Sequence, residues 1–195
     1  MTVLDNGNTQ QLRYEDGMSG EATFVEDREI IIDDDTVPQN DFITPTLLHE
    51  HASNGNKKQL QDCILSGEFD INGVDNMGRT PLIYSVLVEQ IECVNLLLKH
   101  GANIDKPDSD GRTALHWAAY QGNHKLVKLI ISKSKNKSSC DKEGMTPLHL
   151  SISHDNIKVM QIILKYLSEQ EVDAADFRDM TALCWSVSYL SLIHI

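Results

Sequence analysis

The stretch GRTALHWAAYQGN, residues 111–123, decides the fold of this chain because its pattern returns along the sequence. Each copy is anchored by a threonine, and successive threonines lie 34, 33, 33 and 35 residues apart: Thr46, Thr80, Thr113, Thr146 and Thr181. A near-constant period of this length is typical of repeat proteins whose units stack on one another. The sequence therefore predicts four full units and a partial fifth unit.

Each unit is expected to contain a turn, a helix, a second turn and a second helix. Threonine is a good residue to precede a helix, and Pro81 and Pro147 follow it at the first helical position, where the missing N–H costs nothing. The second helix carries apolar residues at helical spacing, such as Val94, Leu97 and Leu98. One unit cannot bury its own apolar face, so the units must stack.

The period of 33 and the Thr-Pro-Leu-His segment at residues 146–149 resemble the ankyrin repeat. The resemblance covers residue 46 to about residue 189. It implies an all-α ankyrin-repeat solenoid of stacked helix-turn-helix units over residues 44–189. Residues 190–195 lack the turn that follows the first helix elsewhere, and are interpreted as a truncated or non-native tail.

Residues 1–43 carry most of the negative charge of the chain. They contain 11 acidic and 2 basic residues, whereas the formal net charge of all 195 residues is −12. A segment with this charge and no repeat pattern is expected to be a disordered acidic leader. Within it, EIIIDDD at residues 29–35 resembles a SUMO-interacting motif, in which Ile30, Ile31 and Ile32 would add as a strand to the edge of a sheet in SUMO.

Several function classes are disfavoured by the sequence. No GxSxG, GxxxxGK[ST], HExxH or GxGxxG motif is present, so we expect neither catalysis, nor a cofactor, nor a metal site. The near-neutral repeat region does not favour nucleic acid, and no run approaches the ~20 apolar residues of a membrane span. The absence of a secretion signal and four widely spaced cysteines predict a cytoplasmic location, with the nucleus as an alternative.

The histidine of the opening stretch occupies the fourth position of its unit. The residues at this position are His49, Ile83, His116, His149 and Cys184. A metal ligand or catalytic base would not recur every 33 residues and then be replaced by isoleucine. The ankyrin resemblance implies instead that this histidine bridges backbone groups of neighbouring units, with both ring nitrogens satisfied.

The next position holds large side chains in most units: Glu50, Tyr84, Trp117, Leu150 and Trp185. The resemblance implies that they pack between the first helices. Contact with a peptide in a groove is the alternative.

The resemblance also implies where partners bind, namely at the tips of the turns and on the inner face of the first helices. Carried onto this sequence, the candidate protein-binding residues are Met77, Arg79, Leu87, Val88, Ser109, Asp110, Arg112, Tyr120, Gln121, Lys142, Glu143, Met145, Ser153 and His154. The apolar members are expected to be exposed, and exposed apolar residues on one face indicate a partner site. Ordinary scattered surface residues are the alternative.

The run KLVKLIISKSKNK, residues 125–137, contains five lysines. It is expected either to attract an acidic partner, or the acidic leader of the same chain, or to be a solvated helix face.

Finer features resemble the N-terminal repeats of the inversin family. They are the segment EGMTPLHLS, residues 143–151, and two extra residues after Tyr166, within a likeness that runs from about residue 76 to residue 189. The resemblance implies a non-enzymatic scaffold of the primary cilium that binds other proteins and modulates Wnt signalling through Dishevelled. The alternative is a regulatory ankyrin module of a larger enzyme or channel.

Overall fold

The computed structural model describes residues 5–6, 9–10, 46–153 and 156–193. These belong to two compact parts of the chain, which comprise residues 1–40 and 41–195. In the N-terminal part, strands β1 (Asp5–Asn6) and β2 (Thr9–Gln10) pair antiparallel. The predicted disorder of the rest of the acidic leader lies outside the described residues, and so does the interpretation of residues 30–32.

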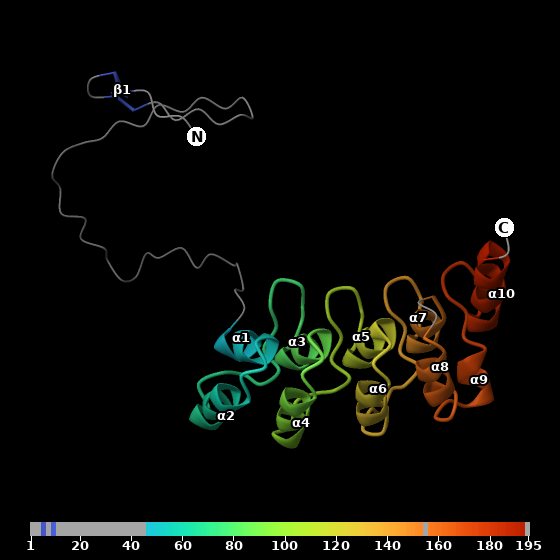
Figure 1. The fold of residues 1–195 in the computed structure, drawn as a ribbon, viewed down its shortest axis with the longest axis horizontal. Coiled ribbons are helices and arrows are strands. Elements are labelled where there is room, and N and C mark those ends of the chain that lie inside the picture. Colours follow the sequence, from blue (N-terminus) through green and yellow to red (C-terminus); the bar gives the residue numbers. More distant parts are fainter. Residues whose placement is uncertain (1–4, 7–8, 11–45, 154–155, 194–195) are drawn as a thin grey trace. The chain divides into compact units, whose positions relative to one another are not determined.

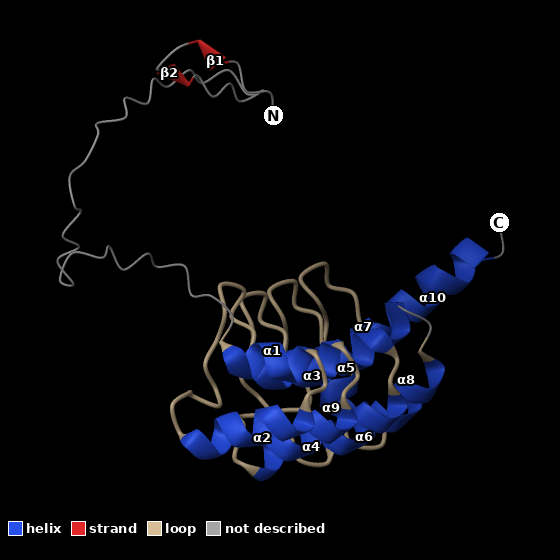
Figure 2. Cartoon of the chain, turned by 60° about the vertical axis from the view of Figure 1, so that its left-hand side comes forward, coloured by secondary structure: helices blue, strands red, loops and turns tan. Residues whose placement is uncertain are grey.

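The part that comprises residues 41–195 is built from helices stacked in two layers. The helices are α1 (Leu47–Ser53), α2 (Lys57–Ser66), α3 (Pro81–Leu87), α4 (Ile91–Lys99), α5 (Ala114–Gln121), α6 (His124–Ile131), α7 (Pro147–Ser153), α8 (Ile157–Ile163), α9 (Glu169–Val172) and α10 (Ala182–Ile193). The first helices, α1, α3, α5 and α7, form one layer, and α2, α4, α6 and α8 form the other (Figures 1 and 2). Long hairpin loops project beyond the layer of first helices (Figure 1). This arrangement confirms the predicted all-α solenoid of stacked helix pairs.

The first helices begin where the threonines predict. Thr80 Oγ1 accepts a hydrogen bond from the backbone N–H of Ile83 at 3.3 Å, and Pro81 follows as the first residue of α3. Thr113 precedes α5 in the same way, in a capping box that it forms with His116. Satisfying the N–H groups of the first turn in this way stabilises a short helix.

The core consists of columns of apolar side chains that continue from unit to unit. The leucines two residues after each threonine form the clearest column, and its first four members are at most 2% exposed: Leu48, Leu82, Leu115 and Leu148. Burial of each of these side chains stabilises the stack by about 1.5–3 kcal/mol. Leu183, the fifth member, is 73% exposed in α10. Leu98, expected on the buried stripe of α4, is only partly buried.

The two extra residues after Tyr166 form more than a longer loop. They belong to the segment that contains the single-turn helix α9, whose capping residue Ser168 donates from Oγ to Glu171 Oε2 at 2.7 Å. Glu171 Oε1 also accepts from Ser138 Oγ of the preceding unit at 2.8 Å. The insertion therefore adds a contact between units, because both carboxylate oxygens of Glu171 are used.

The turn between α3 and α4 contains a residue in an unfavourable backbone conformation. Glu89 has a φ of +58°, whereas glycines occupy the equivalent turns of the neighbouring units, Gly55 at +69° and Gly122 at +77°. Left-handed backbone costs a residue with a Cβ atom about 1–2 kcal/mol, and glycine adopts it readily.

We therefore expect Glu89→Gly to raise the free energy of unfolding by about 0.5–1 kcal/mol, after allowance for the greater chain entropy of glycine. Urea denaturation of the full chain measures this change. Gly122→Ala is the matched control and should be destabilising, because its added Cβ would overlap the side-chain amide of Asn156. A loss of stability in Glu89→Gly would show that the glutamate side chain outweighs the backbone cost.

Candidate protein-binding site

The repeated histidines join neighbouring units, as predicted. His116 Nδ1 accepts from the backbone N–H of Thr113 at 3.1 Å, so Nε2 carries the proton and donates to the carbonyl oxygen of Met145 at 3.2 Å. His49 and His149 make the same pair of contacts, and their Nε2 atoms lie 2.9 Å and 3.1 Å from the next carbonyl oxygen. The prediction that these histidines bridge backbone groups is confirmed.

Burial determines the charge of this histidine. Removal of the His116 ring from water lowers its pKa to about 4, against the smaller opposing effects of the Met145 carbonyl and Asp141. The ring is therefore neutral near pH 7, with both nitrogens engaged. Within the described residues, no group of histidine, cysteine and acidic side chains is arranged to hold a metal ion.

Each hairpin is organised by a buried aspartate. Asp108 Oδ1 accepts from the backbone N–H groups of Asp110 at 3.0 Å and Arg112 at 2.8 Å. Asp108 Oδ2 accepts from the indole N–H of Trp117 at 2.8 Å. The aspartate therefore closes its own hairpin and attaches it to the first helix of the same unit.

The same arrangement recurs in two other units. Asp75 accepts from the Tyr84 hydroxyl at 2.7 Å, and Asp176 accepts from the Trp185 indole N–H at 2.8 Å. Burial alone would raise the pKa of Asp75, but the hydrogen bonds from Tyr84 and the backbone outweigh it and lower that pKa. The large side chains of the fifth position thus anchor hairpins, which the sequence interpretation did not foresee. The available signal was an aspartate five residues before each of these threonines.

The fourth unit has no such side chain, because Leu150 replaces the aromatic residue. The guanidinium of Arg112, from the preceding hairpin, takes its place, with Nε 3.0 Å from Asp141 Oδ2. The carboxylate is almost fully buried, and the Arg112 side chain is 20% exposed. Arg112 therefore joins two units and is not freely available to a partner, which corrects the expectation from the sequence.

Two arginines enclose the tryptophan of the opening stretch. The guanidinium carbons of Arg79 and Arg112 lie 5.2 Å and 5.3 Å from the centre of the Trp117 ring. Tyr120 meets Trp117 edge to face, with ring centres 5.9 Å apart. Each such cation–π contact contributes about 0.5–2 kcal/mol. Through Trp117, the two arginines at the ends of the hairpins are thus connected to Tyr120 at the exposed end of α5.

The hairpin tips form a continuous row. The backbone N–H of Ser109 donates to the Met77 carbonyl oxygen, and that of Lys142 donates to the Asp110 carbonyl oxygen, both at 2.8 Å. The N–H of Phe177 donates to the Glu143 carbonyl oxygen at 3.1 Å. Ladders of this kind fix each tip beside the next.

The candidate residues differ in their exposure. Seven are exposed: Met77, Val88, Ser109, Asp110, Tyr120, Lys142 and Glu143. Four are partly buried: Arg79, Leu87, Arg112 and Gln121. The side chain of Ser153 and all of His154 lie outside what the structure describes.

Met145 is a correction, since it was expected to be exposed and is only 7% exposed. Its backbone N–H donates to Asp141 Oδ1 and its carbonyl oxygen accepts from His116, which holds this residue inside the stack. Phe177, at the tip of the fourth hairpin, was missed and is 78% exposed. Its position directly after the hairpin aspartate is the sequence signal that could have identified it.

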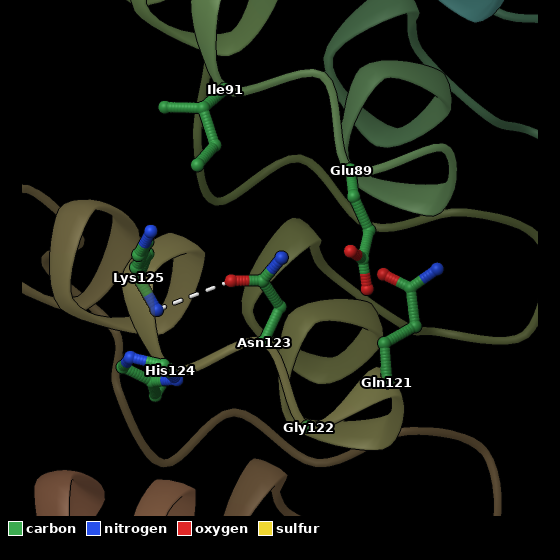
Figure 3. Close-up of a pocket in the computed structure, with 7 residues that line it drawn as sticks. All are labelled: Glu89, Ile91, Gln121, Gly122, Asn123, His124 and Lys125. Atoms are coloured by element: carbon green, nitrogen blue, oxygen red, sulfur yellow. Dashed lines mark hydrogen bonds between the residues drawn. The ribbon is translucent and has the colours of Figure 1, made fainter.

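A pocket of about 420 Å³ lies where the turn after α3 faces the turn after α5. Glu89 and Gln121 point toward each other there (Figure 3). Gln121 donates from Nε2 to the Leu87 carbonyl oxygen, so this candidate also joins two units. The pocket is therefore part of the contact between two units.

Comparisons with known proteins agree with this architecture. The family model for ankyrin repeats in three copies matches residues 29–108 and 100–176. Inversin from Homo sapiens is 40% identical over 148 residues, which is 76% of this chain and 14% of inversin. Inversin from Mus musculus is 42% identical over 147 residues, which is 75% of this chain and 14% of that protein.

A cation channel is also similar over a shorter segment. The transient receptor potential cation channel subfamily A member 1 from Homo sapiens is 39% identical over 71 residues, which is 36% of this chain and 6% of the channel. In the part of the chain that the structure describes, no helix has the length and apolar character needed to cross a membrane.

Proposed function

Because the chain belongs to the ankyrin repeat family, we propose that it binds partner proteins through the hairpin tips and the first helices, without catalysis. The observation that carries this proposal is the row of tips joined by backbone hydrogen bonds between units. A surface held rigid before binding loses little conformational entropy when a partner docks, and this favours affinity.

The proposed contact surface combines apolar and polar groups. Met77, Val88, Tyr120 and Phe177 supply exposed apolar area, and aromatic residues are enriched among the positions that dominate binding energy. Ser109, Asp110, Lys142 and Glu143 supply polar groups along the tips. Ser153 and His154 remain in the proposal by their position in the fourth unit.

The finer function that we propose is that of an inversin-like scaffold. Similarity to inversin over about three quarters of the chain supports it. The resemblance implies a role in ciliary organisation and in Wnt signalling through Dishevelled, in the cytoplasm or at the cilium. The chain spans about 14% of the length of human and mouse inversin, so these roles belong to the proposal.

Co-precipitation of Dishevelled with the full chain tests this function. We expect Tyr120→Ala combined with Phe177→Ala to reduce recovery by at least about tenfold, because two side chains of this kind commonly contribute more than about 1 kcal/mol each. The matched control is Leu65→Ala combined with Leu164→Ala, which also removes two exposed apolar side chains, but from α2 and the end of α8 in the other layer. Equal recovery with both double variants would contradict the proposed surface.

Similarity to the cation channel supports a second candidate function, that of a regulatory module in a larger channel or enzyme. The full-length transcript distinguishes the two. Calmodulin-binding IQ segments would favour the inversin-like scaffold, whereas a kinase domain or membrane-spanning helices would favour the regulatory module.

A further inference from the structure

The second helices of the third and fourth units, together with the segments that follow them, carry an unusual concentration of positive charge. Residues 123–137 and 156–167 contain seven lysines and no acidic residue, although the whole chain has a net charge of −12. These lysines are Lys125, Lys128, Lys133, Lys135, Lys137, Lys158 and Lys165. We call this area the basic α6–α8 surface.

Most of the positive charges of this surface face solvent. Six of the seven lysines are exposed and Lys137 is partly buried. Within the described residues, no carboxylate lies at ion-pair distance from any of the seven ammonium groups. The second helices of the first two units differ, because Lys57 Nζ there lies 2.8 Å from Glu92 Oε2.

Two acidic residues of adjoining segments, Asp105 and Glu171, accept hydrogen bonds within the stack. Asp105 accepts from Ser134 Oγ at 2.6 Å and from the backbone N–H of Lys135 at 3.0 Å. Glu171 accepts from Ser138 and Ser168, and its charge also interacts with that of Lys137. Because seven lysines outnumber these two carboxylates, an external anionic group can still lower the electrostatic energy of the lysines.

The surface is also rigid and partly apolar. The helices α6 and α8 lie side by side in the second layer (Figure 1). Asn156 Nδ2, at the start of α8, donates to the carbonyl oxygens of Ala119 and Tyr120 and so fixes α8 to the third unit. Exposed apolar side chains alternate with the lysines here: Ile157, Leu164 and Tyr166.

We propose that the basic α6–α8 surface binds an acidic segment of a protein partner whose apolar side chains alternate with its carboxylates. Complementary charge accelerates encounter and selects the partner, and the apolar contacts add affinity. The exposed apolar residues favour a protein over a nucleic acid. Single-stranded nucleic acid is instead held by a charged groove with a series of aromatic side chains on which successive bases stack. In residues 123–137 and 156–167, Tyr166 is the one tyrosine, and phenylalanine and tryptophan do not occur.

This site is separate from the tips proposed above. Lys125, Lys128 and Lys158 lie in the layer of second helices, and the other four lysines follow the ends of α6 and α8. The tips project beyond the layer of first helices (Figures 1 and 2). The chain could therefore join two different partners, as a scaffold must, and either site could fail without the other.

The experiment uses fluorescence anisotropy of the full chain with a labelled peptide of repeated Glu-Glu-Leu triplets. We expect saturable binding that weakens with ionic strength, and no binding of the Gln-Gln-Leu analogue. Lys125→Glu combined with Lys158→Glu should weaken binding by about tenfold, since each reversal replaces an attraction by a repulsion. Lys58→Glu combined with Lys99→Glu changes the net charge equally on α2 and α4 and should leave the affinity within about twofold.

Three outcomes would overturn the proposal. The first is an equal loss of peptide affinity in the two charge-reversal variants. That result would attribute binding to the net charge of the protein and not to this surface. The second is equal binding of the Gln-Gln-Leu peptide, which would remove the role of charge. The third is binding of oligothymidine, or of vesicles of phosphatidylcholine and phosphatidylserine, that is tighter than binding of the acidic peptide. The Tyr120→Ala, Phe177→Ala variant should bind the peptide as the native chain does, which separates this test from that of the tips.

Discussion

Replacing His116 with alanine is expected to lower the free energy of unfolding by about 3–5 kcal/mol. The change removes the acceptor for the Thr113 N–H and the donor for the Met145 carbonyl oxygen. A buried backbone group that loses its partner costs about 1–3 kcal/mol, and the cavity left by the ring adds to this. Urea denaturation of the full chain, followed by far-ultraviolet circular dichroism, measures the loss.

The exposed histidine of the next helix provides the control. His124→Ala removes the same side chain from a position on the surface of α6, and we expect its effect to stay within about 0.5 kcal/mol. Similar losses in the two variants would mean that the bridge between units contributes little. His116→Gln keeps a side-chain acceptor and donor, and should recover part of the stability.

The second large effect that we expect is a loss of the free energy of unfolding at acidic pH, caused by protonation of His116. The pKa of His116 is lowered from 6.5 to about 4, chiefly by burial, so the unfolded chain binds a proton more readily than the folded chain between these values. The stabilisation from the neutral ring is complete above pH 6.5 and is lost as pH falls toward 4. The difference corresponds to roughly 3 kcal/mol, which denaturation midpoints measured from pH 7 to pH 4 would detect.

Other groups must be separated from this effect. Burial also lowers the pKa of His49, which contributes with the same sign. Asp75 and Asp176 have lowered pKa values because hydrogen bonds to the charged carboxylate outweigh burial, so their contributions are lost at more acidic pH. The His116→Gln variant should therefore show a much flatter dependence between pH 6.5 and pH 4. An unchanged slope would assign the acid sensitivity to other groups.

Much of the fold was accessible from the period alone. Threonines spaced by 33 to 35 residues predicted helix pairs, and a histidine that recurs with them and gives way to isoleucine predicted a structural role. The hairpin aspartates repeat with the same period, nine residues before the tyrosine or tryptophan that they bind. They could have been predicted by the same reasoning, because a contact within one unit has a constant separation along the chain.

The candidate site was less predictable, because exposure depends on contacts between units. Arg112 and Met145 were both placed on the surface by their position beside a turn. Arg112 instead crosses to the next unit, where Leu150 leaves the Asp141 carboxylate without an aromatic donor. Met145 lies inside the stack, although Arg79, at the equivalent position two units earlier, is only partly buried.

The order of the helices, their starting residues and the stacking of units follow from local patterns that the amino-acid sequence repeats. Capping and hydrophobic spacing act over a few residues, so they can be recognised without a structure. Which side chains remain available to a partner depends on packing between residues about 30 positions apart. That outcome required the folded chain, because one substitution, such as leucine for an aromatic residue, changes the partner of a carboxylate in the neighbouring hairpin.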